Sequence, residues 1–526
     1  MVRAMLDYNI KVFRIELHIS IGGRNGKMPC GTCSRLGYNQ EELTTLKRMK
    51  SGLLALALAT SPALSGAAPS EPLLPTIGDT TSATISLQQE RVLGQTWARM
   101  LRGQAPLLDD PLVYHYLDDL LWSMVANSQL QDRQLELITV DNGTLNAFAV
   151  PGGIVGVHGG LLLAAEREDE LASVLAHELA HLSQRHFAQQ LEEQRRNRPL
   201  MLAAMLGSIL IAAADSKAGA AAITSTMAGN ASAQLAFSRR NEQEADRIGM
   251  LTLKESGFDP KAMPRMFARM QQSMRFYGDK PPEFLLTHPV TESRIADSAN
   301  RAAQYPASRY RKSSNDFDII RARILLHYSD NPARSLEEYA AAAKRTGLNK
   351  HKYAAMLAAV KTHKYQQATS FYNALSKNYK HNLYVRISHA ELLIAQDKTE
   401  AGLKELSELN KLYPGNLAIE KSYARALFNN DQIEAAITQY KSVTERYPND
   451  VDSWYYLAES YGKIENISAL HDARIEYFLL TGNLDRARQQ VTFAMRERGL
   501  TQLNRARLEE RRREIDEIRS QMEMDF

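Results

Sequence analysis

The sequence predicts a mainly α-helical protein, in which a front half with one small β-sheet is followed by an α-solenoid. Three observations support this. Helical apolar spacing recurs along most of the 526 residues. Short alternating segments lie between residues 135 and 157. The second half repeats with a period of about 34 residues, which is typical of tetratricopeptide repeats. Charged residues make up 24% of the chain and the formal net charge is +4, with no basic block that would indicate nucleic-acid binding.

The front of the chain carries a pattern typical of a secretory signal peptide. A basic cluster at residues 47–50 precedes a Leu- and Ala-rich run, which ends in a small-residue cleavage site at Ala67. The run is shorter than the roughly 18 apolar residues that a membrane anchor needs, so we expect cleavage and no transmembrane anchor. We interpret residues 1–42 as a non-native N-terminal extension, 43–67 as the signal peptide and 68–85 as a flexible lead-in.

The central motif is His177-Glu178-Leu179-Ala180-His181. Acidic residues precede it and an apolar stripe runs through it, so the sequence predicts a helix here. Histidines four residues apart lie on one face of a helix, where their imidazoles can take two corners of a tetrahedral zinc site. Glu178 points to the side and can reach water rather than the metal. This is the H-E-x-x-H signature of a zinc peptidase, which also recurs by chance.

A zinc site needs a third protein ligand, and a later predicted helix supplies a candidate. Glu242 and Asp246 lie one turn apart on that helix. Glu242 can bind the metal while Asp246 accepts a hydrogen bond from a ligand histidine. The metzincin alternative fails because its glycine and third histidine are replaced by Gln184 and Phe187, with His186 one residue out of place. A solvent-exposed acidic helix face remains the alternative for Glu242.

These motifs, with Asn146-Ala147-Phe148-Ala149, Pro151-Gly152-Gly153 and Leu286-Thr287-His288-Pro289, resemble the peptidase family of the HtpX heat-shock protease and the CAAX prenyl protease. The C-terminal repeats make the chain more similar to the periplasmic β-barrel assembly-enhancing branch. The resemblance implies a zincin-like α+β metalloprotease domain at 86–312 and a repeat domain at 313–526. It also implies one Zn²⁺ per chain on His177, His181 and Glu242, with Glu178 and Asp246 as catalytic residues.

The same resemblance suggests roles for residues outside the ligand set. Residues 146–157 would form an edge strand that holds an extended substrate through Asn146, Ala147 and Phe148; alternatively, these strands are core. His288 would be a fourth ligand or a regulatory residue; alternatively, it is a surface histidine before a helix. Arg294 is grouped with the substrate-binding residues and would steady an oxyanion or a site carboxylate.

Two apolar, Ala-rich segments follow the motif helix, at residues 201–214 and 218–233. The first is too short to span a bilayer. We expect a buried helical hairpin, and the alternative is a flap that covers the site or contacts a membrane surface peripherally.

Two functions remain open at this point. The first is an exported, periplasmic zinc endopeptidase that degrades misfolded or stalled outer-membrane β-barrel proteins and assists their assembly, with the repeats recruiting clients or the assembly machinery. The second is a non-enzymatic periplasmic chaperone or scaffold with a latent or vestigial metal site. No nucleic-acid partner is expected in either case.

Overall fold

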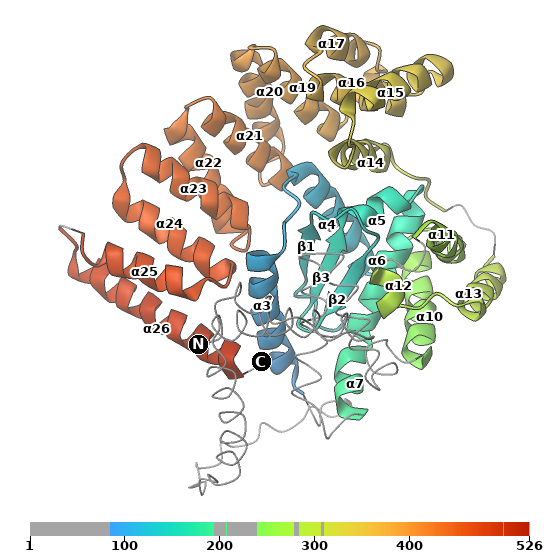
Figure 1. Ribbon diagram of the computed structural model, residues 1–526, viewed down its shortest axis with the longest axis horizontal. Helices are drawn as coiled ribbons and strands as arrows, with labels where there is room; N and C mark the ends of the chain where they lie inside the picture. The colour runs from blue at the N-terminus through green and yellow to red at the C-terminus, as the bar shows by residue number, and fades with distance from the viewer. Residues whose placement is uncertain are drawn as a thin grey trace, which may run out of the picture. The chain divides into compact units, whose positions relative to one another are not determined.

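The computed structural model describes residues 85–193, 207, 239–277, 283–306, 310–497 and 499–524. The described residues are mainly helical and contain one three-stranded sheet, as the sequence predicts (Figure 1). The predicted N-terminal extension, the signal peptide and, apart from Gly207, the two Ala-rich segments lie outside the described residues. Within the described part, no helix combines the length and the apolar character needed to cross a bilayer.

The sheet has the strand order β1-β3-β2, with β1 at Glu136–Val140, β2 at Ala147–Val150 and β3 at Ile154–His158. β1 pairs parallel with β3, and β2 pairs antiparallel with it, so β2 is an edge strand. The turn between β2 and β3 needs glycine. Gly153 has a φ of +84°, and a Cβ there would lie 2.2 Å from the Gln134 carbonyl oxygen.

The two faces of the sheet belong to different hydrophobic clusters. On one face, α3 (Leu87–Gln104) packs through Trp97 onto Phe148 and its neighbours. On the other face, β2 and β3 pack against α4, α5 and α6. The helices of this front part are α4 (Pro111–Val125), α5 (Gly159–Ala164), α6 (Glu168–Ser183), α7 (His186–Glu193), α10 (Arg239–Glu255), α11 (Ala262–Tyr277), α12 (Glu283–Thr287) and α13 (Glu292–Gln304). The metal-motif helix α6 is therefore held between the sheet and the helices that follow it.

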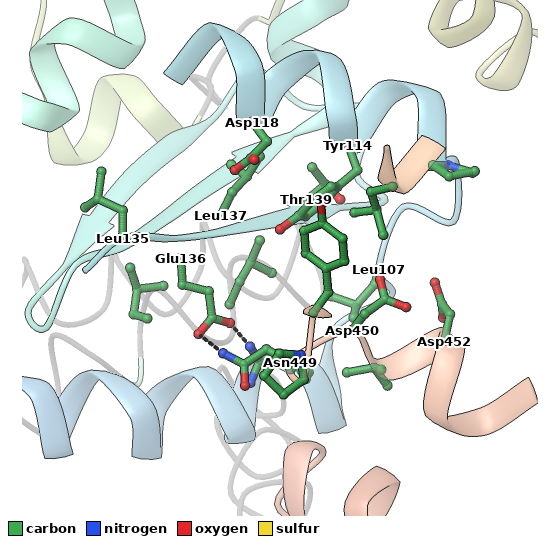
Figure 2. A pocket seen from close by; sticks show the side chains of 18 of the residues that line it. Leu107, Tyr114, Asp118, Leu135, Glu136, Leu137, Thr139, Asn449, Asp450 and Asp452 are labelled. Atoms are coloured by element: carbon green, nitrogen blue, oxygen red, sulfur yellow. Dashed lines mark hydrogen bonds and ion pairs between the residues drawn. The ribbon is translucent and has the colours of Figure 1, made fainter. Parts of the chain in front are cut away.

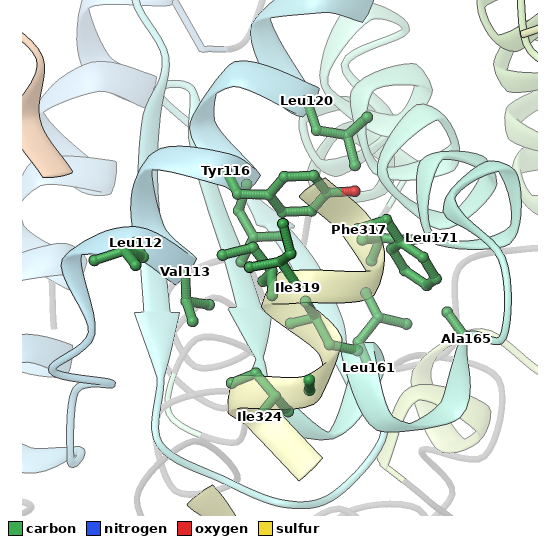
Figure 3. Close-up of a cluster of buried hydrophobic side chains, with 14 of the residues drawn as sticks. Leu112, Val113, Tyr116, Leu120, Leu161, Ala165, Leu171, Phe317, Ile319 and Ile324 are labelled. Atoms are coloured by element: carbon green, nitrogen blue, oxygen red, sulfur yellow. The ribbon is translucent and has the colours of Figure 1, made fainter. Parts of the chain in front are cut away.

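The first helix after the front part, α14 (Asn315–His327), completes the same core. Figure 3 shows Phe317 and Ile319 of α14 beside Tyr116 of α4 and Leu161 of α5. All four side chains are buried. The hydrophobic core does not end at residue 312, because one buried cluster contains residues from both sides of it. The predicted domain boundary at this residue stays a prediction.

The rest of the chain is a series of helix pairs. They comprise α15 (Pro332–Thr346), α16 (Asn349–Lys361), α17 (Tyr365–Asn373), α18 (Lys377–Lys380), α19 (Leu383–Ala395), α20 (Thr399–Leu412), α21 (Leu417–Asn429), α22 (Ile433–Arg446), α23 (Val451–Lys463), α24 (Ile467–Leu480), α25 (Leu484–Ala494) and α26 (Gln502–Met524). Consecutive helices contact one another along the series. Left-handed turn residues recur at the tetratricopeptide period of about 34 residues, at His363, Asp397, Asp431 and Glu465.

Small residues lie where paired helices approach each other closely. Ala368, Gly402 and Ala436 are all buried. A Cβ on Gly402 would lie 2.8 Å from the Ala390 carbonyl oxygen on the preceding helix. The array also contacts the front part, for instance through Arg425 and Asp109, whose charged groups lie 2.5 Å apart.

Candidate metal centre

Helix α6, which carries the metal motif, is buried along almost its whole length. Its first turn holds Glu168, Asp169 and Glu170, which suit the positive end of the helix dipole. These acids are not solvated: Arg265 lies 2.8 Å from Asp169, and Arg269 lies 3.3 Å from Glu170. The acidic start that predicted the helix therefore also ties it to α11.

Four side chains from three places in the sequence converge on one buried cluster. His177 and His181 come from α6, Glu242 comes from α10, and His288 follows α12. One donor atom from each lies within 4.8 Å of the others. His177 Nε2 lies 3.1 Å from His181 Nε2 and 3.4 Å from His288 Nδ1, while Glu242 Oε1 lies 2.9 Å from His288 Nδ1. The sequence therefore predicted a set of residues that the fold does bring together.

The donor set fits a zinc ion. Ligand nitrogens about 2.0–2.1 Å from a tetrahedral zinc lie roughly 3.3 Å from one another. His181 Nε2 and His177 Nε2 lie 3.4 Å and 3.5 Å from the nearest oxygen of Glu242, close to that spacing. Imidazole and carboxylate are also the ligands that zinc takes in catalytic sites. The identity of the metal as zinc stays a prediction.

The carboxyl group of Glu178 lies beside this cluster and is fully buried. Burial raises its pKa, and the nearby imidazoles of His288 and His177 oppose this shift. The His288 Nε2 atom lies 3.7 Å from Glu178 Oε1. A buried carboxyl with a raised pKa is suited to taking up and returning a proton.

Asp246 orients the first histidine. Asp246 Oδ1 lies 3.0 Å from His177 Nδ1, on the side of the ring opposite the cluster. Arg294 holds the same carboxylate with two hydrogen bonds, from Nε at 2.8 Å and from Nη2 at 2.7 Å. Burial would raise the pKa of Asp246, but Arg294 and His177 outweigh it and hold that pKa below its usual range. Asp246 is thus an acceptor for His177 rather than a metal ligand.

Of the two roles considered for Arg294, the structure favours the one on a site carboxylate. Besides its bonds to Asp246, Arg294 Nη1 lies 2.6 Å from Glu242 Oε2 and donates to the Pro289 carbonyl oxygen at 2.9 Å. Its side chain is 4% exposed. The guanidinium of Arg294 thus contacts the carboxylates of Asp246 and Glu242, and the grouping of Arg294 with substrate-binding residues stays a prediction.

The edge strand β2 contacts α6, as the substrate-strand prediction requires. The His158 amide donates to the Asn146 carbonyl oxygen at 3.1 Å. In an antiparallel pair, alternate residues point their amides to the partner strand. The amide groups of Ala147 and Ala149 therefore point away from β3, toward the edge of β2 with which no described strand pairs (the free edge). The Ala149 amide reaches Glu178 and opposes the rise in the pKa of that carboxyl.

The Phe148 side chain lies on the face of the sheet away from α6, and its predicted contact with substrate stays a prediction. Its ring packs edge-on against Trp97 at 5.4 Å, in the cluster on the face of the sheet away from α6. Asn146 is also buried and points to the same face as Phe148, because side chains alternate along a strand. Strand alternation was visible in the sequence, but the choice of face depends on how β2 packs. Among the three predicted contacts, only Ala147 has its backbone at the free edge.

Sequence reasoning missed the position of His186 and considered it only as a misplaced metzincin ligand. In the structure, His186 is fully buried, and its Nδ1 lies 3.1 Å from His181 Nδ1. The motif spacing gave no signal for this contact, because it depends on the turn between α6 and α7.

A separate polar cavity of about 390 Å³ lies between the β1 side of the sheet and the repeats. Figure 2 shows Glu136 of β1 facing Asn449, whose amide donates to it at 3.0 Å. Asp450 and Asp452 line the cavity and contact Lys421 at 2.7 Å and 3.3 Å. None of the cluster residues lines this cavity, so it is distinct from the metal centre.

Comparison with known proteins agrees with the geometry of the cluster. The family model for peptidase family M48 matches residues 111–302, which include all four cluster residues. A beta-barrel assembly-enhancing protease from Escherichia coli O157:H7 is 34% identical over 487 residues, covering 91% of this chain and 98% of its own length. A protease of the same name from Yersinia pestis is 37% identical over 365 residues, covering 67% of this chain and 74% of its own length.

A relative from Vibrio cholerae is 44% identical over 278 residues, which is 53% of this chain and 57% of that protein. The Escherichia coli match runs over nearly the whole of both chains, repeats included. On this similarity, the chain is a metalloprotease of peptidase family M48 and belongs to the beta-barrel assembly-enhancing proteases.

Proposed function

We propose that the protein is an exported zinc endopeptidase whose metal is held by His177, His181 and Glu242. The observation that carries this proposal is the buried cluster of donor atoms within 4.8 Å of one another, with the Glu178 carboxyl beside it. A zinc ion held there would polarise a peptide carbonyl and make water a better nucleophile.

Glu178 is the general base. It takes a proton from the attacking water and returns it to the amine of the departing peptide, which requires a carboxyl that can exist in both protonation states near neutral pH. Its burial supports this role because burial raises its pKa toward that range. Asp246 is a positioning residue, because it touches His177 and not the reacting atoms.

The substrate is an extended polypeptide that pairs with the free edge of β2. The amide group of Ala147 at this edge can pair with a main-chain partner, whereas the Ala149 amide is directed at Glu178, and main-chain pairing accepts many sequences. Such a strand would pass beside Glu178, which the Ala149 amide approaches.

His288 restrains the enzyme by occupying the fourth corner of the site. Its Nδ1 lies 3.4 Å from His177 Nε2 and 2.9 Å from Glu242 Oε1, so it stands where water would have to enter. It follows the short helix α12, whose Phe284 ring lies 4.9 Å from its own. Movement of this segment would open the corner.

The clients are outer-membrane β-barrel proteins in the periplasm, of which misfolded or stalled ones are degraded and maturing ones are assisted. This part of the proposal rests on the name of the relatives in Escherichia coli and Yersinia pestis. The repeats recruit clients or the assembly machinery, since stacked helix pairs give extended binding surfaces.

The test is cleavage of casein by the purified chain starting at Ala68, with metal analysis of the same samples. Wild type, Glu178→Gln and His288→Ala are compared. We expect about one zinc per chain in all three. Loss of the base lowers turnover by about 10²–10⁴-fold, and His288→Ala is at least as active as wild type.

Two results would contradict the proposal. One is a Glu178→Gln protein that cleaves at the wild-type rate, which would remove the assigned base. The other is zinc in all three proteins with cleavage by none, which would favour the alternative of a non-enzymatic chaperone or scaffold.

A further inference from the structure

The second motif histidine has a partner of its own behind the cluster. His181 directs Nε2 at Glu242 and His177, and its Nδ1 lies 3.1 Å from Nδ1 of His186. The two rings meet edge to face, with centroids 4.9 Å apart and an interplanar angle of 77°. This contact mirrors that of His177 with Asp246, on the opposite ring nitrogen from the cluster.

The turn between α6 and α7 sets this geometry. Arg185 is in the left-handed region, with a φ of 52°. This conformation is unfavourable for a non-glycine residue. The guanidinium of Arg185 is held by Glu90 at 2.9 Å and by the Ile85 carbonyl oxygen at 2.7 Å. These half-buried contacts fix the turn that directs His186 toward His181.

The protonation pattern of the pair follows from metal binding. If Nε2 of His181 offers its lone pair to a metal, its Nδ1 carries the hydrogen and must donate it. His186 Nδ1 is then the acceptor, so the hydrogen of His186 is on Nε2. That atom faces Glu244 Oε2 at 3.6 Å.

We propose that His186 is a positioning residue that fixes the ring orientation and tautomer of His181 for metal binding. The proposal deepens the assigned function, because it takes His181 as a zinc ligand. Each motif histidine is then oriented by a contact to the ring nitrogen that faces away from the cluster, His177 by Asp246 and His181 by His186. The contact through His186 continues to Glu244, on the same helix as Glu242 and Asp246.

The test measures zinc affinity of the full chain by competition with a chromophoric chelator. His186→Phe keeps an aromatic ring but cannot accept the hydrogen bond. His186→Asn can place its amide oxygen near the lost Nδ1. His471→Phe is the matched control, since His471 is also buried but lies among the repeats, hydrogen-bonded to Gln490 at 2.8 Å. Absorption spectra of the cobalt-loaded proteins report the ligand geometry independently.

Loss of a group that orients a metal ligand lowers metal affinity by about 10–100-fold. We expect this loss and an altered cobalt spectrum for His186→Phe, with recovery to within about threefold in His186→Asn and no change in His471→Phe. Equal affinity of His186→Phe and wild type would overturn the proposal. So would equal losses in His186→Phe and His186→Asn, which would indicate packing alone.

If His186→Phe does not fold, His186→Asn compared with His186→Ala decides, with circular dichroism confirming helix content. Tighter zinc binding by Asn than by Ala supports the proposal, and equal binding overturns it. A wild-type chain that binds no zinc would instead refute the proposed function, so the two failures are distinguishable.

Discussion

Substitution of Gly249 by alanine tests whether the separation of α10 and α6 sets the metal site. Gly249 lies in α10, the helix that carries Glu242 and Asp246. A Cβ at this position would lie 3.0 Å from the Ala176 carbonyl oxygen and 3.1 Å from the His177 Cα. The methyl group would therefore press on the backbone of α6 next to the first ligand histidine.

The structure gives both the sign and the size of the effect. Ordinary contacts are about 3.5–4.0 Å, so the helices must separate by a few tenths of an ångström or more. Overpacking of this kind costs about 1–3 kcal/mol, whereas replacing a helical glycine by alanine gains about 1 kcal/mol. We expect a net loss of about 0–2 kcal/mol in the free energy of unfolding, the difference of these two effects.

Zinc affinity should fall more than stability does, because the higher helix propensity of alanine cannot restore the distances between the metal-binding side chains. Metal–ligand distances are held within about 0.2 Å, and a shift of α10 against α6 exceeds this. We expect zinc binding at least tenfold weaker by chelator competition, with stability measured by urea unfolding in the presence of chelator. Gly462→Ala is the matched control, since its Cβ meets only the end of the Leu470 side chain, at 3.2 Å. A Gly249→Ala protein that gains stability and binds zinc like wild type would refute the reasoning.

Two further predictions concern buried charges. Arg294→Lys should lower the free energy of unfolding by about 3–5 kcal/mol. The reason is that an ammonium group cannot reproduce the forked guanidinium contacts that hold Asp246 and Glu242. Urea unfolding measures this, and a wild-type free energy of unfolding would contradict it. Burial and the neighbouring Asp119 raise the pKa of Asp118 to about 6, so between about pH 4 and 6 the folded state binds more protons and stability falls as pH rises. Asp118→Asn should therefore increase the free energy of unfolding by about 1–2 kcal/mol at pH 7, after a discount for partial exposure, and leave it unchanged at pH 4. Equal increases at both pH values would contradict a raised pKa of Asp118.

The parts of the site that sequence predicted best depend on a single helical period. His177 and His181, like Glu242 and Asp246, lie one turn apart, so the face they share follows from spacing alone. The repeats were predictable for a similar reason, since their period can be seen in the sequence itself. That the helix of His177 packs against the helix of Glu242 was inferred from the combination of motifs. In the structure, Gly249 lets these two helices approach closely.

The parts that could not be predicted from the sequence depend on tertiary packing. The alternation of β2 is plain in the sequence, but Trp97 on α3 decides that Phe148 faces away from α6. Similarly, His186 entered the sequence analysis only as a histidine that does not fit the metzincin spacing. The left-handed backbone conformation of Arg185 places His186 behind His181. This conformation is stabilised by Glu90, which lies almost a hundred residues earlier in the chain.

The charges of the buried site explain why a divalent cation suits it. Glu178, Glu242 and Asp246 are all buried, and the cation that contacts Glu242 and Asp246 is Arg294. Burying unpaired carboxylates costs several kcal/mol each unless they are compensated. The His288 imidazole at 2.9 Å from Glu242 supplies part of this compensation. A dication at the centre of the four donor atoms would supply the rest, so that metal binding and the packing of α6 against α10 stabilise each other. The same linkage supports the proposed restraint by His288, because His288 contacts the Glu242 carboxylate that would also bind the metal.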